Sequence, residues 1–172
     1  MSTGAAGDFW LWSNTVYGRD EVRKAALALQ DQFDLNVNIL LWCVWSSYHF
    51  DTHQELTMRK AIDVTGNWNK EVTANIRKAR RFAKSALGDS ALYTELKNIE
   101  LKAEKHEQSQ LQELAFNIGV TQSGSGETAQ RIALRNLAIY VALAKAARCK
   151  GFSALMLQDF ADAALYDLAA AS

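Results

Sequence analysis

The sequence predicts an all-α, single-domain helical bundle of about six or seven helices. Three observations favour this fold class. The chain has no proline and only nine glycines, so long helices can run without the residues that most often end them. Apolar residues recur at spacings of three and four, and no alternating strand pattern is present. With 172 residues, the chain has the length of one domain and can bury about 70% of the surface that its unfolded form exposes.

The first two helices are expected over residues 8–17 and 20–33, on either side of Gly18. Asp8 is the expected N-cap of the first, because its carboxylate can accept a hydrogen bond from a free amide of the first turn. Apolar residues follow at helical spacing in both segments, and the basic residues of the second segment fall on the opposite face. Both segments are therefore expected to bury one face.

The third helix is expected to begin at Asp34 or Asn36, as its cap, and to run to about Phe50. It is apolar on nearly every side, which is typical of a helix in the middle of a bundle. Tryptophan side chains bury a large area, and their indole N–H needs a partner. The tryptophans predict a core for the first three helices, or else an aromatic groove for an apolar ligand or a partner helix. Four of the five lie in the first fifty residues: Trp10, Trp12, Trp42 and Trp45.

The middle of the chain is expected to hold two separate helices. A short helix over residues 56–64 should end in a turn at Gly66-Asn67. A basic helix should then run over residues 68–87, where Gly88 ends it and Asp89 begins the next.

The rest of the chain predicts a long helix, a linker and a pair of helices. The long helix covers residues 90–118, and its segment 104–110 is polar on all sides. This segment is expected to project beyond the bundle as a candidate partner surface. The glycine- and serine-rich stretch that follows is flexible by composition. The predicted division is a core over 8–118, a flexible linker over 119–126 and a C-terminal helical pair over 127–172, within one helical domain over 1–172.

Charge is balanced overall but segregated along the chain. Nineteen basic and nineteen acidic residues give a formal net charge of zero. Residues 59–88 hold eight of the basic and two of the acidic residues, whereas residues 89–113 hold three basic and six acidic ones. Neighbouring helices of opposite sign attract one another, although each exposed pair contributes only about 0–1 kcal/mol. This pattern argues against a polyanion as the partner.

The composition favours a cytoplasmic protein. Cys43 and Cys149 both lie in apolar helical runs, which indicates buried, reduced thiols rather than a secreted disulfide framework. The first seven residues contain neither the basic patch nor the apolar run of a signal peptide. The longest apolar runs, 39–45 and 137–144, are far shorter than the ~18–20 residues that span a bilayer. No membrane contact is expected.

The N-terminal residues resemble a known family. The signature consists of Phe9-Trp10-x-Trp12-Ser13 with Tyr17, Leu29-Gln30-Asp31, Leu35-x-Val37-Asn38, and Leu40-Leu41-Trp42-Cys43-x-Trp45. It resembles small helical bacterial proteins catalogued as a domain of unknown function. Less specific matches follow at Trp68-x-x-Glu71-Val72, at Arg77, Arg80, Arg81 and Lys84, and at Glu95-Leu96, Glu100 and Ala103-Glu104.

The resemblance covers about residues 8–116, and the chain departs from the family pattern in lacking a proline near Asn75. It implies a bacterial source and an all-helical fold. It implies no enzymatic activity.

The candidate metal site is the segment His49-Phe-Asp51-Thr-His53-Gln-Glu55. In a helix, His49 and His53 would lie one turn apart on one face, the spacing that lets two imidazoles share a metal. Asp51 or Glu55 could add an oxygen ligand. The segment is not H-E-x-x-H, and no E-x-x-H element is present elsewhere. The favoured alternative is a polar helix end with two solvent-facing histidines, and no cofactor is expected.

The candidate anion or partner face is basic and lies on one helix. Such a stripe can collect phosphates through its charge. No aromatic residue interleaves it on its solvent side, so an acidic protein partner is favoured over nucleic acid. The alternative is a solvated face paired with Glu95, Glu100 or Glu104 of the following helix. The face consists of Arg77, Arg80, Arg81 and Lys84.

The candidate ligand pocket combines polar and aromatic residues of the first three helices. A buried amide or carboxylate must find partners, because leaving one unpaired costs about 1–3 kcal/mol. Simple helix capping and bonding to a neighbouring helix is the favoured alternative. The candidate lining is Tyr17, Gln30, Asp31, Asn38, Trp42 and Trp45.

These features favour a non-catalytic interaction protein, an adaptor or regulator that binds a protein partner through helix faces or forms a homo-oligomer. The alternative is a small-molecule or metal-binding helical protein, possibly an enzyme, with a pocket between the Trp-rich helices and the His49/His53 segment. Neither cysteine has a histidine near it in sequence, and no G-x-S-x-G motif is present. Covalent catalysis therefore has no support.

Overall fold

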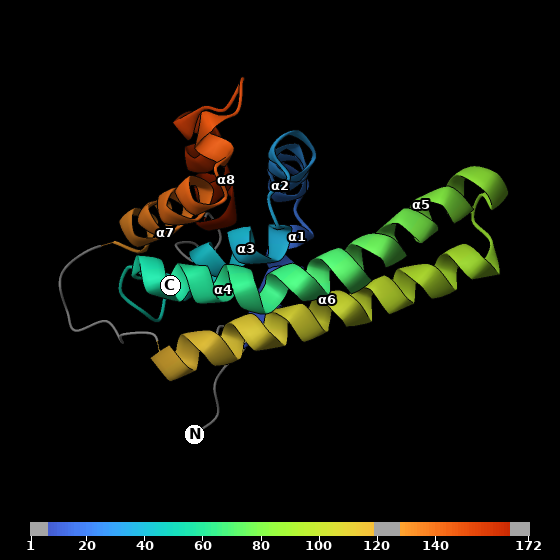
Figure 1. Cartoon of the computed structure of the whole chain (residues 1–172), viewed down its shortest axis with the longest axis horizontal. Coiled ribbons are helices and arrows are strands. Elements are labelled where there is room, and N and C mark those ends of the chain that lie inside the picture. Colours follow the sequence, from blue (N-terminus) through green and yellow to red (C-terminus); the bar gives the residue numbers. More distant parts are fainter. Residues whose placement is uncertain (1–6, 119–127, 166–172) are drawn as a thin grey trace.

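A computed structural model of the chain describes residues 7–118 and 128–165. These residues form seven packed helical rods and no strand, which confirms the predicted all-α class. One rod consists of α4, a π-helical turn and α5 (Figure 1). The elements are α1 (Phe9–Tyr17), α2 (Asp20–Phe33), α3 (Val37–Ser46), α4 (Glu55–Trp68), the π-helical turn (Asn69–Thr73), α5 (Ala74–Leu87), α6 (Ala91–Ile118), α7 (Ala129–Leu143), a 3-10 turn (Ala146–Arg148) and α8 (Ala154–Leu165).

Helix α3 lies at the centre of the bundle, as its composition predicts. Every residue from Asn38 to Ser46 is buried. Helices α1, α2, α6, α7 and α8 all pack against it. Helices α7 and α8 thus lie on the same bundle as the N-terminal helices, and the Asn136 amide of α7 donates to the Cys43 carbonyl at 3.2 Å. The third helix ends at Ser46, short of the predicted Phe50.

The helix ends follow local capping chemistry. Asp8 accepts a hydrogen bond from the Leu11 amide at 2.9 Å, which confirms it as the N-cap of α1. Of the two candidate caps for α3, Asn36 is the one that acts, because its side chain accepts from the Asn38 amide at 2.8 Å. Gly88 ends α5 with a φ of 64°, a conformation that favours glycine.

The predicted turn at Gly66-Asn67 is wrong, because the chain stays helical from Glu55 to Leu87. A glycine inside a helix costs only about 1 kcal/mol relative to alanine. Packing against α6 offsets that cost at this point: the Trp68 indole Nε1 donates to the Ala103 carbonyl at 3.1 Å. The helix changes its local geometry just afterwards, in the π-helical turn.

The prediction that segment 104–110 projects from the bundle is also wrong. Glu107 and Gln108 are buried and face a polar interior. The part that extends beyond the other helices is α5 with the N-terminal half of α6, and residues 74–102 are called the hairpin arm below (Figure 1). Its exposed large apolar side chains are Phe82, Leu87, Leu92, Ile99 and Leu101.

Three further predictions concern burial and the parts of the chain outside the helices. Cys43 is buried as expected, but Cys149 is exposed, since it follows the 3-10 turn rather than lying inside α7. The predicted linker, 119–126, and the last residues of the predicted C-terminal pair, 166–172, lie outside the described residues. Among the described helices, none combines the length and the apolar character that crossing a membrane requires.

Candidate functional site

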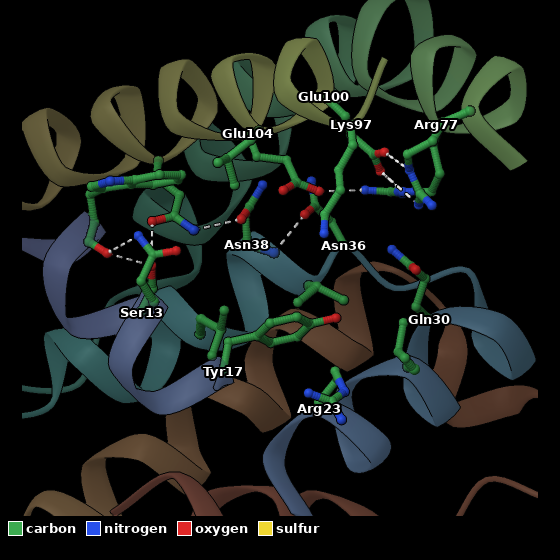
Figure 2. A pocket seen from close by; sticks show the side chains of 18 of the residues that line it. Ser13, Tyr17, Arg23, Gln30, Asn36, Asn38, Arg77, Lys97, Glu100 and Glu104 are labelled. Carbon is green, nitrogen blue, oxygen red and sulfur yellow. Dashed lines mark hydrogen bonds and ion pairs between the residues drawn. The ribbon is translucent and has the colours of Figure 1, made fainter. Parts of the chain in front are cut away.

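A cleft of about 380 Å³ lies between two walls of the molecule (Figure 2). Helices α1 and α2 and the start of α3 form one wall, and α5 and α6 form the other. The volume falls within the ~300–1,000 Å³ typical of ligand pockets. The cleft therefore has room for a small molecule.

Three of the six predicted pocket residues line this cleft: Tyr17, Gln30 and Asn38. Trp42 and Trp45 do not, because both are fully buried in the core. Asp31 is exposed outside the lining, 3.9 Å from Arg81. The cleft thus lies on the side of α3 that carries Asn38, away from the tryptophans.

The basic face of α5 meets the same cleft, although no sequence motif links the two groups of residues. Arg77 Nε donates to Glu100 Oε1 at 2.9 Å and Arg77 Nη2 to Glu104 Oε1 at 3.0 Å. Arg80 also bonds to Glu100. Burial lowers the pKa of Arg77, but its bonds to the two glutamates outweigh burial and hold that pKa above its ordinary value. Pairing with α6, the alternative considered for this face, is therefore what Arg77 and Arg80 do.

The other two residues of the basic face are placed differently. Arg81 lines the cleft and is exposed. Lys84 does not line it; its ammonium bonds to Asp89 and lies 4.9 Å from the centre of the Tyr93 ring. The predicted face therefore divides into two arginines held by α6, one exposed arginine at the cleft and one lysine outside it.

Two more cations line the cleft, Arg23 and Lys97. Arg23 is exposed and pairs with Asp20 of its own helix. Within the described part of the chain, the Lys97 ammonium has no hydrogen-bond or ion-pair partner. Its side chain extends from α6 toward the middle of the cleft (Figure 2). Sequence reasoning missed both residues, since neither belongs to a motif.

A fixed chain of polar side chains lies along the floor of the cleft. Ser13 Oγ donates to Gln108 Oε1 at 2.7 Å, and Gln108 Nε2 donates to Asn38 Oδ1 at 2.8 Å. All three residues are buried. The chain fixes the Asn38 amide group, whose Nδ2 has no acceptor among the described residues.

The region that contains this cleft matches a family model. The model is described as a protein of unknown function (DUF2390), and it matches residues 8–111. The chain belongs to the DUF2390 family. The matched region runs from α1 into α6 and includes every lining residue of the cleft, whereas α7 and α8 lie outside it. Neither a curated protein nor a solved structure matches the chain.

A buried carboxylate, Glu107, lies inside the DUF2390 region next to the cleft residues Glu104 and Gln108. It is 0% exposed and accepts hydrogen bonds from Asn36 Nδ2, from Asn69 Nδ2 at 3.3 Å and from Thr73 Oγ1 at 3.4 Å. Asn36 also caps α3, so the carboxylate lies near the positive end of that helix.

Sequence reasoning missed the role of Glu107, although a signal for it exists. Glu100, Glu104 and Glu107 are spaced so that they share one face of α6. This acidic face lies opposite the basic residues of α5. A shared acidic face that follows a basic helix indicates a polar helix contact rather than a solvated segment.

The structure does not place the two candidate metal ligands on one helix. Both His49 and His53 lie between the end of α3 and the start of α4, so they do not have the one-turn helical spacing on which the metal prediction was based. The expectation that both face solvent is wrong for His53, which is 4% exposed. Burial lowers its pKa to about 4. No group of three or more metal-ligating side chains occurs among the residues that the structure of this DUF2390 protein describes.

Proposed function

We propose that this DUF2390 protein is a non-catalytic, cytoplasmic binding protein whose cleft between α1–α3 and the hairpin arm takes a small molecule. One observation carries the proposal: polar residues of the N-terminal helices and cations of the arm converge on one concavity of about 380 Å³. A concave site with an apolar lining and a few convergent polar groups is the usual form of a ligand pocket.

The groups that line the cleft suit binding better than turnover. Its two carboxylates, Glu100 and Glu104, are held by arginines. The hydroxyl of the lining residue Ser13 donates to Gln108. No histidine or cysteine is among the described residues that line it. A nucleophile paired with a general base, the arrangement that covalent catalysis needs, does not occur in this lining.

The proposal is tested by a fragment library of mixed charge, screened by ¹⁵N–¹H NMR against the full-length protein. We expect fragments to shift the amides of Tyr17 and Asn38. Val37→Trp, which places an indole at the half-buried lining, should abolish these shifts. Val64→Trp, at an exposed position outside the cleft, should leave them unchanged. A library without cleft-binding fragments, or equal binding by Val37→Trp, would contradict the proposal.

The second candidate function is binding of a protein partner, or of a second copy of the chain, through the hairpin arm. The exposed apolar side chains of the arm favour it, above all Phe82, which is 74% exposed. Exposed apolar side chains of this size can contribute to an interaction surface. The arm extends beyond the other helices, so that a partner could reach both of its helices (Figure 1).

Sedimentation equilibrium tests the homo-oligomer. We expect a concentration-dependent increase in mass that Phe82→Ser removes and that Leu155→Ser, at an exposed position of α8, retains. A photo-crosslinking residue at position 82, compared with one at position 155, tests a different partner in the cell. A monomer at every concentration together with equal crosslinking at the two positions would rule out this candidate.

A further inference from the structure

We infer that the ligand of the cleft is a small organic anion, a carboxylate or phosphate group carried on an apolar body. The inference rests on the proposed binding function and names the chemical class that the lining recognises. Three properties of the lining carry it: its surplus of positive charge, its unused hydrogen-bond donors and its apolar side chains.

The charge of the lining is positive after its internal ion pairs are counted. Its only carboxylates among the described residues, Glu100 and Glu104, are bonded to Arg77 and Arg80. Three more cations line the cleft: Arg23, Arg81 and Lys97. The acidic partners of the first two, Asp20 and Asp31, lie outside the lining. The cleft therefore attracts an anion and repels a cation.

Lys97 is the residue that contacts the anionic group in this inference. Its ammonium has no partner within the described residues, so an incoming oxyanion breaks no existing ion pair. Lys97 comes from α6 and Arg23 from α2, so the two cations reach the cleft from opposite walls (Figure 2). Each of the two cations offers charged donors to an oxyanion in the cleft, and bonds between charged groups are about twice as strong as neutral ones.

Two neutral donors complement these cations. Asn38 Nδ2 is fixed by the bond from Gln108 to Asn38 Oδ1, and it has no acceptor of its own among the described residues. The Tyr17 hydroxyl likewise has no hydrogen-bond partner in the described part of the chain. Burial, followed by the charge of Glu104, raises the pKa of Tyr17, so its hydroxyl remains protonated and can donate. Both donors match the oxygens of a carboxylate or phosphate.

The remaining lining distinguishes an organic anion from an inorganic one. Leu27, Val37, Leu41 and Leu101 line the cleft together with Trp10. A bare phosphate ion would leave this apolar surface in contact with water, whereas an alkyl or aryl body would cover it. Removal of apolar surface from water favours binding of such a body. The lining as a whole therefore suits an anionic group joined to an apolar chain or ring.

The inference is tested with four probes that share one apolar body: octanoate, octyl phosphate, octanol and octylamine. Each is titrated into the full-length protein, and the amide shifts of Tyr17 and Asn38 report occupancy of the cleft. We expect both anions to bind at least about tenfold more tightly than octanol, because hydrogen bonds to charged groups are stronger than neutral ones. Octylamine should not bind, because the lining is positively charged. Added salt should weaken binding of the anions and not that of octanol.

Variants at position 97 test whether Lys97 contacts the anionic group. Lys97→Met should weaken both anions about tenfold and leave octanol unchanged, and Lys97→Arg should retain anion binding. Lys102→Met, at an exposed position of α6 outside the lining, is the matched control and should bind like the parent protein. Lys97 is exposed, so its replacement should not disturb folding, which circular dichroism verifies.

The outcomes separate this inference from the proposed function. Binding of octanol or octylamine as tight as that of octanoate overturns the anionic class but leaves a small-molecule cleft. If Lys97→Met does not weaken binding of the anions, the contact assigned to Lys97 is overturned. Failure of all four probes while library fragments occupy the cleft overturns the class alone. Failure of the probes and of the library together overturns the proposed function as well.

Discussion

The imidazole of His53 lies flat against the indole of Trp42, with ring centroids 4.4 Å apart and ring planes 6° from parallel. Both residues are buried, and His53 Nε2 has no hydrogen-bond partner among the described residues. The His53 backbone amide donates to Asn136 Oδ1 at 2.8 Å, which ties this segment to α7. The histidine therefore acts as a neutral ring of the core.

We expect the free energy of unfolding to fall as the pH is lowered from 6.5 to 4. Burial holds the pKa of His53 at about 4 in the folded protein, whereas the ordinary histidine pKa is 6.5. Between these values the unfolded chain binds more protons than the folded one, so stability increases with pH. The full difference amounts to about 3 kcal/mol. Urea unfolding between pH 4.5 and 7.5 measures it.

The matched variants for this pH effect are His53→Phe and His106→Phe. His53→Phe keeps a ring on Trp42 but cannot titrate, so its stability should depend less on pH. His106 is exposed on α6, and its replacement should keep the parent slope. If the free energy of unfolding of His53→Phe depended on pH as strongly as that of the parent protein, another group would cause the loss of stability.

Glu107→Ala should destabilise the protein by about 3 kcal/mol or more. The substitution leaves three donors without their acceptor: buried Thr73 and half-buried Asn36 and Asn69. Each buried unsatisfied group costs about 1–3 kcal/mol. Glu113→Ala, at an exposed position of α6, should change stability by less than about 0.5 kcal/mol. Chemical unfolding measures both, and equal values for the two variants would contradict the assigned network.

A double-mutant cycle should show stronger coupling for Arg77 with Glu104 than for Arg59 with Glu55. The first pair is largely screened from water, with side-chain exposures of 17% and 29%, whereas the second is exposed by 59% and 62%. Replacement of each partner by leucine should give a coupling energy of about 1–3 kcal/mol for the first pair. The exposed pair should give about 0.3–0.5 kcal/mol. Equal couplings would argue against a closed contact between α5 and α6.

At a protein concentration where the chain is monomeric, Phe82→Ser should change the free energy of unfolding by less than about 0.5 kcal/mol, because the side chain is mostly in water. Phe160→Ala should cost about 3–5 kcal/mol, because Phe160 of α8 is fully buried. Thermal or urea unfolding of the two variants gives the comparison. A large loss of stability in monomeric Phe82→Ser would mean that another part of the same chain covers this face of the arm.

Much of the helical organisation could be predicted because it depends on neighbouring residues. Asp8, Asn36 and Gly88 act within a single turn, so their chemistry can be read from the sequence. The central position of α3 follows from its apolar composition alone.

The wrong predictions concern segments whose structure depends on contacts with residues far away in the sequence. Gly66 and Asn67 favour a turn locally, yet Trp68 bonds to Ala103 and the helix continues. The composition of the polar segment that contains Glu107 predicts a surface position, because hydrophobic periodicity cannot detect an interior built from hydrogen-bonded polar groups.

The candidate site could be predicted in parts but not as a whole. One group follows from the rule that polar residues beside apolar helices need partners: Tyr17, Gln30 and Asn38. The other group follows from helical spacing: Arg77, Arg80 and Arg81. That both groups line one cleft depends on how α5 packs beside α1 and α2. The sequence does not specify that packing. Its aromatic residues instead predict a pocket beside Trp42 and Trp45, which the structure buries in the core.

The π-helical turn Asn69–Thr73 sets which way α5 faces. Such a turn contains one residue more than the α-helical turn that it replaces, and one residue corresponds to about 100° of rotation around a helix axis. Without that residue, Arg77 and Arg80 would point about 100° away from Glu100 and Glu104. Loss of a single codon in this stretch would therefore change the charge of the cleft more than most point mutations within it. The positions of Arg77 and Arg80 at the cleft therefore depend on the number of residues in this turn as much as on the presence of the arginines.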